Sequence, residues 1–253
     1  MKNDLVKIII KNKLHCVFLS PHQDDAALSC GELLSQLNGK TELTIINFFT
    51  KAHNKPYTLS AKKFLQTSGY EDANKLYEER RKEDKKALST FKAKVIDLDL
   101  QDALFRKKKH SSFLGNILPE FSHIYPTYRW HVIKKIAKDD YAVSELKKKL
   151  KVFKNKKILV FAPYGIGGHA DHKIVRQVCE ELFDEYILYS DFPYNIILRT
   201  NGSKLVKGNK YELEPKMDKK EKLIRGYKTQ FQGLFPTNRL PKHKEIYFSN
   251  TSL

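Results

Sequence analysis

The sequence predicts a Rossmann-like α/β fold, with a mostly parallel sheet, helices on both faces and an active site at the carboxyl ends of the strands. Short apolar runs alternate with longer segments of helical spacing, and this alternation is typical of parallel sheets. Polar residues able to bind metals or transfer protons follow two of the apolar runs directly. Ligand sites of open parallel sheets lie at such positions.

Five apolar runs are expected to be strands, because each is short and bounded by polar or turn-forming residues. They are HCVFLS (15–20), ELTIINFFT (42–50), KVIDLDL (94–100), KILVFAP (157–163) and YILYS (186–190). From residue 191 onward the pattern is less regular and includes a basic, hairpin-like piece at 196–213.

Helices are expected between these strands. DAALSCGELLSQL (25–37) has apolar residues at helical spacing, and residues 60–91 read as one long, exposed amphipathic helix. Further helices are predicted over 130–153, over ADHKIVRQVCEELF (170–183) and near 218–232. A chain of 253 residues is expected to form a single domain, 1–253.

Composition points to a cytoplasmic protein. No apolar run approaches the length of a membrane span, and lysines interrupt the N-terminal apolar residues, so a signal peptide is not expected. Three cysteines, Cys16, Cys30 and Cys179, form no paired spacing. They are expected to be packed, reduced thiols.

The formal net charge is +18, from 47 lysines and arginines against 29 acidic residues. Much of it lies in lysine-rich stretches at 106–110, 147–157 and 216–222, which read as solvated surface. A field that favours anionic substrates or membrane surfaces is the alternative, and a nucleic-acid site is the least favoured. No RNA-binding motif, zinc finger or helix-turn-helix pattern accompanies the charge, so no specific nucleic-acid partner is predicted.

Two polar clusters carry the chemistry. SPHQDD (20–25) follows the strand at 15–20, and GIGGHADH (165–172) follows the strand at 157–163. Because both come at carboxyl ends of parallel strands, they are expected to face each other across one crevice.

His22, Asp25 and His172 are the predicted metal ligands. His22 and Asp25 are three residues apart, so their side chains can converge in a turn, and His172 adds a third ligand from the other loop. Two histidines and one carboxylate suit a catalytic Zn²⁺ with an open position for water; Fe²⁺ and other divalent ions also accept this set. The alternative is that each motif merely caps a helix.

Neighbouring residues then acquire catalytic roles. Asp24, beside a ligand, is positioned to take a proton from an attacking water. His169, as an imidazolium, would stabilise a developing oxyanion or protonate a leaving amine, and Asp171 would orient it and hold its charge. Glycines at 165, 167 and 168 allow the loop to turn tightly.

PHQDD (21–25) and HADH (169–172) resemble the two signatures of the LmbE-like or PIG-L-type N-deacetylases. Weaker likenesses occur at 80–88, 98–106, 189–194 and 227–235. The resemblance implies a zinc-dependent hydrolase that removes acetyl groups from N-acetylglucosamine-containing or related amino-sugar substrates. It also implies the same site residues: His22, Asp25 and His172 for the metal, Asp24 as base, and His169 with Asp171 for the tetrahedral intermediate.

The sequence departs from the family at a few positions. Gln23 and Ala26 replace the proline and glutamate of many members, and neither is needed as ligand or base. Gly167 stands where one branch carries a tyrosine, so a tyrosine contribution would have to come from Tyr164 or Tyr194.

Substrate contacts are less well defined. Asp102 and Arg106 are candidates for holding sugar hydroxyls or a phosphate, with a surface ion pair as the alternative; Arg80 and Arg81 are weaker candidates. The expected partner is an N-acetylated sugar or glycoconjugate, with anionic acceptors among those allowed.

Two other function classes remain open. Mononuclear iron oxygenases also use two histidines and one carboxylate, but they are expected to show a run of short strands. A non-catalytic carbohydrate- or polyanion-binding protein on this fold would retain the pocket without turnover, although the intact base Asp24 argues against it.

Overall fold

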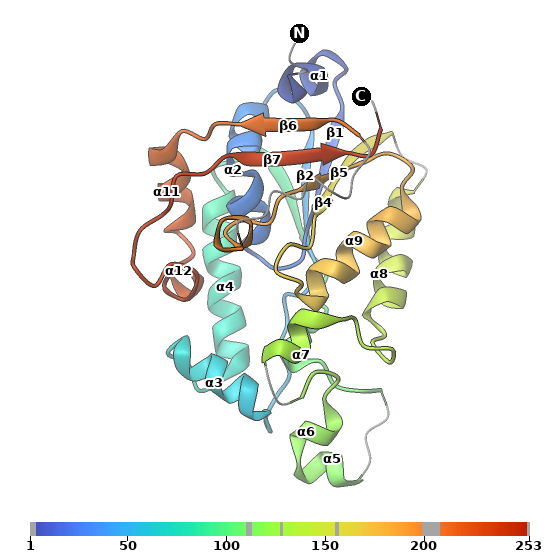
Figure 1. Ribbon diagram of the computed structural model, residues 1–253, viewed down its shortest axis with the longest axis vertical. Coiled ribbons are helices and arrows are strands. Elements are labelled where there is room, and N and C mark those ends of the chain that lie inside the picture. Colours follow the sequence, from blue (N-terminus) through green and yellow to red (C-terminus); the bar gives the residue numbers. More distant parts are fainter. Residues whose placement is uncertain (1–3, 110–112, 127–128, 155–156, 199–207, 252–253) are drawn as a thin grey trace.

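The computed structural model describes residues 4–109, 113–126, 129–154, 157–198 and 208–251. Its centre is a seven-stranded sheet in the order β3-β2-β1-β4-β5-β7-β6 (Figure 1). The strands are β1 (His15–Ser20), β2 (Leu43–Asn47), β3 (Ala93–Asp97), β4 (Ile158–Pro163), β5 (Tyr186–Tyr189), β6 (Lys210–Leu213) and β7 (Glu245–Ser249).

The first five strands are parallel, and β6 and β7 close one side of the sheet as antiparallel strands. The predicted mostly parallel sheet is therefore confirmed. Chain order reverses between β1 and β4, which lie side by side at the centre. Such a reversal opens a crevice at the carboxyl ends of the two strands.

Helices and helical turns connect the strands. They are α1 (Leu5–Lys11), α2 (Asp25–Leu37), α3 (Leu59–Thr67), α4 (Ala73–Leu88), η1 (Ala103–Phe105), α5 (Phe113–Ile117), α6 (Pro119–Ser122), α7 (Arg129–Lys134), α8 (Ala142–Leu150), η2 (Lys151–Phe153), α9 (Ala170–Leu182), α10 (Tyr194–Ile197), α11 (Met217–Ile224) and α12 (Lys228–Leu234). Among the described residues, no helix is both long and apolar enough to cross a membrane.

Alternate side chains of β1 build two separate cores. Cys16 and Phe18 pack with α1 and α2 on one face, whereas Val17 and Leu19 pack with α8 and α9 on the other. This period of two is the geometry of a strand buried on both sides. The three cysteines are buried and unpaired, as predicted.

The predicted long helix over 60–91 is two helices, α3 and α4. Gly69 has a φ of +76°, a left-handed conformation that ends α3. Asp72 then starts α4, because its side chain accepts a hydrogen bond from the backbone N–H of Lys75.

The predicted helix over 130–153 is also interrupted. The loop between α7 and α8 contains Asp140. Its carboxylate accepts hydrogen bonds from the backbone N–H of Ala142 and from the guanidinium of Arg106. Residues 218–232 likewise form two helices, α11 and α12. The expected hairpin at 196–213 lies partly outside the described residues; within them, β6 pairs with β7 far along the chain.

Candidate active site

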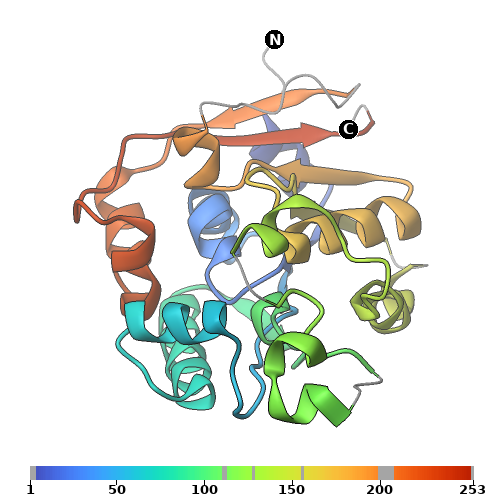
Figure 2. The same cartoon turned by 60° about the horizontal axis from the view of Figure 1, so that its bottom comes forward.

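Two loops meet at the carboxyl ends of the central strands. One joins β1 to α2, and the other joins β4 to α9; both lie at the end of the sheet that comes forward in Figure 2. Ser20 shapes the first loop, because its hydroxyl donates to the carbonyl of His22 at 2.6 Å and accepts from the N–H of Ala26 at 3.0 Å. The ring centroids of His22, on the first loop, and His172, in the first turn of α9, lie 5.4 Å apart, so the two motifs meet at this end of the sheet.

His22, Asp25 and His172 converge on one point. Oδ2 of Asp25 lies 3.2 Å from Nδ1 of His22 and 3.3 Å from Nε2 of His172. One ligand atom from each residue lies within 4.8 Å of the others. The structure therefore brings together the three residues predicted as metal ligands.

The other nitrogen of each histidine contacts a carboxylate. Nδ1 of His172 lies 2.6 Å from Asp191, and Nε2 of His22 lies 3.2 Å from Asp171. Hydrogen bonds of this kind fix the imidazole tautomer and aim the free nitrogen at the shared point. Asp191 was not predicted, although it lies in the YSDFPY stretch just beyond the carboxyl end of β5.

Negative charge is in excess around this point. The buried carboxylates are Asp24, Asp25, Asp102, Asp171 and Asp191. Burial opposes ionisation of Asp25, but the neighbouring His172 and His22 hold its pKa at about 2. Two aimed imidazole nitrogens, an ionised carboxylate and surplus negative charge fit a divalent cation such as Zn²⁺.

A second group also brings possible ligand atoms within 4.8 Å: His22, His169 and Asp171. Here Asp171 is already committed, because its carboxylate pairs with Arg106 and accepts from the N–H of Ala103 at 2.9 Å. The group containing Asp25 and His172 is therefore the better candidate for a metal.

Asp24 is a buried carboxylate with no capping role. It begins α2, yet its side chain makes no hydrogen bond to the first turn of that helix. Burial, together with the charge of Asp25, raises the pKa of Asp24 to about 6. A carboxylate with this pKa exchanges protons readily near neutral pH.

His169 is the N-cap residue of α9. Its Nδ1 accepts a hydrogen bond from the backbone N–H of Asp171 at 3.2 Å, which leaves the ring proton on Nε2. Burial lowers the pKa of His169 to about 4. This direction of the shift favours the neutral ring, with its proton on Nε2, over the imidazolium expected from the sequence.

Arg106 faces the interior. Its side chain is 1% exposed, its guanidinium pairs with Asp140 and Asp171, and its carbon lies 4.6 Å from the ring centroid of Phe49. These contacts hold Asp171 and leave no face for a substrate. Asp102 accepts from the hydroxyl of Tyr77 at 2.7 Å.

The two weaker candidates for substrate contacts, Arg80 and Arg81, lie in different surroundings. Arg81 forms ion pairs with Asp97 at 2.6 Å and Asp99 at 2.7 Å. Arg80 is buried, with its guanidinium carbon 5.3 Å from the ring centroids of both Phe64 and Tyr77.

Of the two candidate tyrosines, Tyr194 lies at the site. Its ring meets that of His172 edge-on, with centroids 6.2 Å apart. A Cβ on Gly167 would lie 3.0 Å from Cγ of Tyr194, and Gly167 has a φ of +90°, so both the close ring and the backbone conformation favour glycine. The ring of Tyr164 instead lies under the guanidinium of Arg176, at 4.7 Å.

Known structures share the fold. Teicoplanin deacetylase in its zinc-inhibited form is 21% identical, with a TM-score of 0.72 over 93% of this chain and 97% of that one. The N,N'-diacetylchitobiose deacetylase of Pyrococcus horikoshii is 16% identical, with a TM-score of 0.57 over 98% of this chain and 90% of that one. No curated protein sequence matches the chain.

A family profile described as PIG-L, GlcNAc-PI de-N-acetylase, matches residues 17–183. This range runs from β1 to the end of α9 and includes both polar loops. The chain belongs to the PIG-L family of de-N-acetylases.

Proposed function

We propose that the protein is a zinc-dependent N-deacetylase that hydrolyses the acetamide of an N-acetylglucosamine-containing or related amino sugar, releasing acetate and a free amine. The observation that carries the proposal is the convergence of His22, Asp25 and His172 beside a buried carboxylate, Asp24, whose pKa is about 6. Family membership and the deacetylases among its structural neighbours support the same reaction.

His22, Asp25 and His172 would hold the metal. When bound, a zinc ion would polarise the acetamide carbonyl and make water more acidic. Asp171 and Asp191 contact the other nitrogen of each ring, and these contacts would keep both histidines oriented for metal binding.

Asp24 serves as the general base in this proposal. Its carboxylate takes a proton from the attacking water and later returns it to the leaving amine, so that the protons balance over the cycle. A pKa near 6 leaves it ionised at neutral pH and still basic enough to accept the proton.

His169 stabilises the carbonyl oxygen as negative charge develops there. Its Nδ1 is engaged by the backbone of Asp171, so Nε2–H is the atom available to donate. Arg106 is a positioning residue in this proposal, because it pairs with the Asp171 carboxylate, which in turn contacts His22.

We also propose a cytoplasmic location. The three cysteines are buried free thiols, which is typical of proteins kept under reducing conditions.

Asp24→Asn tests the base. The variant should retain metal, since Asp24 is outside the ligand set, and acetate release from N-acetylated sugars should fall by a factor of about 10² or more. Metal content by elemental analysis and acetate release on the same samples separate the two effects. Asp99→Asn, at an exposed carboxylate beyond the end of β3, is the matched control and should keep full activity.

Near-full activity of metal-loaded Asp24→Asn would remove Asp24 as the base. Absence of acetate release by the parent protein across acetylated amino sugars, with metal bound, would favour the non-catalytic binding protein instead.

A further inference from the structure

Exposed apolar side chains gather at one end of the molecule. Among the described residues, eleven large apolar side chains are exposed. Nine of them, here called the apolar rim, are Leu59, Leu114, Ile117, Leu118, Phe121, Ile133, Ile196, Ile197 and Leu198. They lie on or beside α3, α5, α6, α7 and α10.

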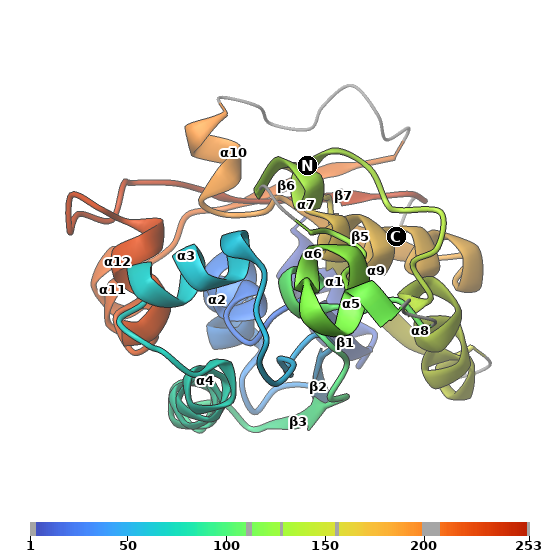
Figure 3. The same ribbon diagram turned by 90° about the horizontal axis from the view of Figure 1, so that it is seen from below.

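The rim surrounds the carboxyl ends of the strands. Its helices follow β2, β3 and β5, so they lie at the same end of the sheet as the two polar loops; all face the viewer in Figure 3. The other two exposed apolar residues, Val95 and Val152, are on β3 itself and on the turn before β4. The concentration of apolar surface is therefore specific to the active-site end.

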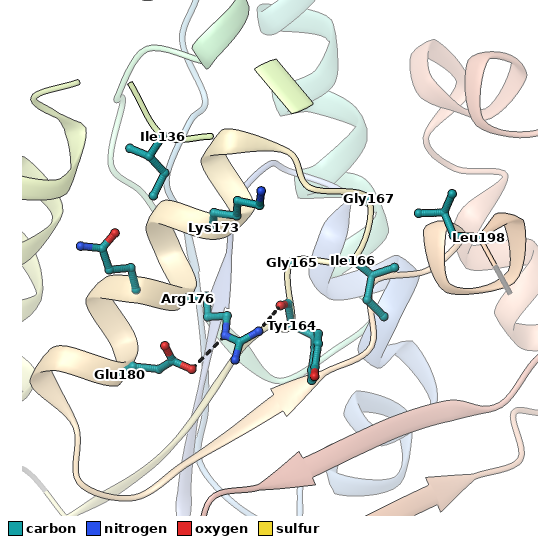
Figure 4. A pocket seen from close by; sticks show the side chains of 10 residues that line it. Ile136, Tyr164, Gly165, Ile166, Gly167, Lys173, Arg176, Glu180 and Leu198 are labelled. Carbon is teal, nitrogen blue, oxygen red and sulfur yellow. Dashed lines mark hydrogen bonds and ion pairs between the residues drawn. The ribbon is translucent and has the colours of Figure 1, made fainter. Parts of the chain in front are cut away.

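Parts of the rim are joined to one another. The backbone N–H of Leu59 donates to the carboxylate of Glu120 at 3.0 Å, which ties the start of α3 to α6. Ile136 and Leu198 line one open cavity of about 470 Å³, which links the segment after α7 to α10 across the glycine loop (Figure 4).

Positive charge accompanies the apolar residues. In residues 51–70, 105–138 and 192–198, Glu120 is the sole acidic residue of the sequence. Exposed lysines on these segments are Lys51, Lys55, Lys62, Lys63, Lys108, Lys109, Lys135 and Lys138. Exposed Glu71 and Asp139 flank these segments, so the rim combines apolar side chains with a predominantly, but not wholly, positive surface.

We infer that the apolar rim and its lysines dock on an anionic lipid bilayer. Apolar side chains on several short helices, interspersed with lysines, match the boundary between lipid headgroups and acyl chains. Each lysine near an anionic membrane surface adds about 1 kcal/mol of attraction. A protein partner would be expected to bury a continuous apolar interface, whereas these side chains stand on several separate helices.

Vesicle binding of the full chain tests this docking and does not depend on the proposed function. The protein should sediment with vesicles of phosphatidylcholine and phosphatidylglycerol, and at least tenfold more weakly with phosphatidylcholine alone. Binding should fall at about 1 M salt, where the Debye length is about 3 Å.

Two pairs of variants locate the surface. Ile197→Ser with Leu198→Ser should weaken vesicle binding at least tenfold, whereas Val152→Ser, at an equally exposed valine away from the rim, should not. Lys108→Glu with Lys109→Glu should weaken it similarly, whereas Lys92→Glu with Lys94→Glu, at the amino end of β3, should have little effect.

Thermal unfolding of each variant confirms that it is folded. The inference is overturned if anionic vesicles fail to bind the protein at low salt, or if neither rim variant weakens binding. It is also overturned if sedimentation velocity finds a dimer that Ile197→Ser with Leu198→Ser dissociates, because the rim would then bind a second copy.

Discussion

Two buried ionic clusters contact α2, one beside its middle and one at its amino end, and they differ in how their charge is balanced. In the first, the ammonium of Lys220 on α11 pairs with the carboxylate of Glu245 on β7, and both side chains are almost fully buried. Glu245 also accepts hydrogen bonds from three neutral donors: the N–H groups of Glu32 and Leu33 and the hydroxyl of Tyr247. We call this pair and its donors the closed cluster.

The active-site cluster is the opposite case. Asp24, Asp25, Asp102, Asp171 and Asp191 are all buried there. The guanidinium of Arg106 pairs with Asp171, but it is shared with Asp140. Burial opposes protonation of His22 and His172, but the surrounding carboxylates raise the pKa of both imidazoles, so the histidines balance only part of this charge in the absence of a metal. Burial of charge alone therefore does not mark a functional site in this protein. An excess of carboxylates marks the place where a cation would bind.

Breaking the closed cluster should have the largest effect on stability. Lys220→Met leaves the Glu245 carboxylate buried without its cation, and removal of one partner of such a pair costs about 3–5 kcal/mol. Urea unfolding of the metal-free protein measures this loss. Lys222→Met, at an exposed lysine of the same helix, is the control and should change stability little.

The double variant Lys220→Met with Glu245→Leu should recover much of that loss, because it removes both charges together. If the single Lys220→Met variant proved as stable as the parent, the closed cluster would not be a balanced pair.

Removing a carboxylate from the active-site cluster should lower the affinity for the metal and have little effect on the stability of the fold. Asp191→Asn takes away the charge behind Nδ1 of His172, and loss of such a partner typically lowers metal affinity 10- to 100-fold, or by about 1.4–2.7 kcal/mol. Competition with a chelator measures the affinity.

The metal-free Asp191→Asn protein should lose much less stability than Lys220→Met, because the amide oxygen of asparagine can still accept from the N–H of Ile166. A large loss of stability in urea, with unchanged metal affinity, would place Asp191 in the same structural class as Glu245 and would remove the contrast between the two clusters.

The sequence predicted the parts of the active site that depend on local spacing and strand order. His22 and Asp25 are close in sequence, and His172 follows a neighbouring strand, so their convergence follows from the parallel sheet. Asp191 and Glu245 escaped prediction, because their roles depend on the side-chain directions of residues distant in sequence.

In the fold, too, local sequence patterns predicted some features and missed others. The extent of α2 and the central strands follow from apolar periodicity, and they were predicted closely. The break between α3 and α4 depends on Gly69, and the loop before α8 depends on the bond from Arg106 to Asp140, which periodicity does not encode.

The smallest expected effect is a dependence of stability on pH beside the closed cluster. The ring of His243 stacks on Phe192 with centroids 3.7 Å apart, its Nδ1 donates to the carbonyl of Pro241, and its Nε2 is buried without a hydrogen-bond partner among the described residues. Burial, together with the charge of Lys220, lowers the pKa of His243 to about 4.

Because the unfolded chain binds this proton near pH 6.5 and the folded chain near pH 4, the folded state binds fewer protons between these values. Stability contributed by neutral His243 is therefore present above pH 6.5 and declines as the pH falls through this window, by about 1 kcal/mol between pH 7 and pH 5.5. His243→Phe retains a ring to stack on Phe192 and removes the proton-binding nitrogen, so urea unfolding of this variant should show a shallower decline over the same range. Parallel pH profiles for the parent and His243→Phe would exclude His243 as the source and would leave the closed cluster without a titrating neighbour.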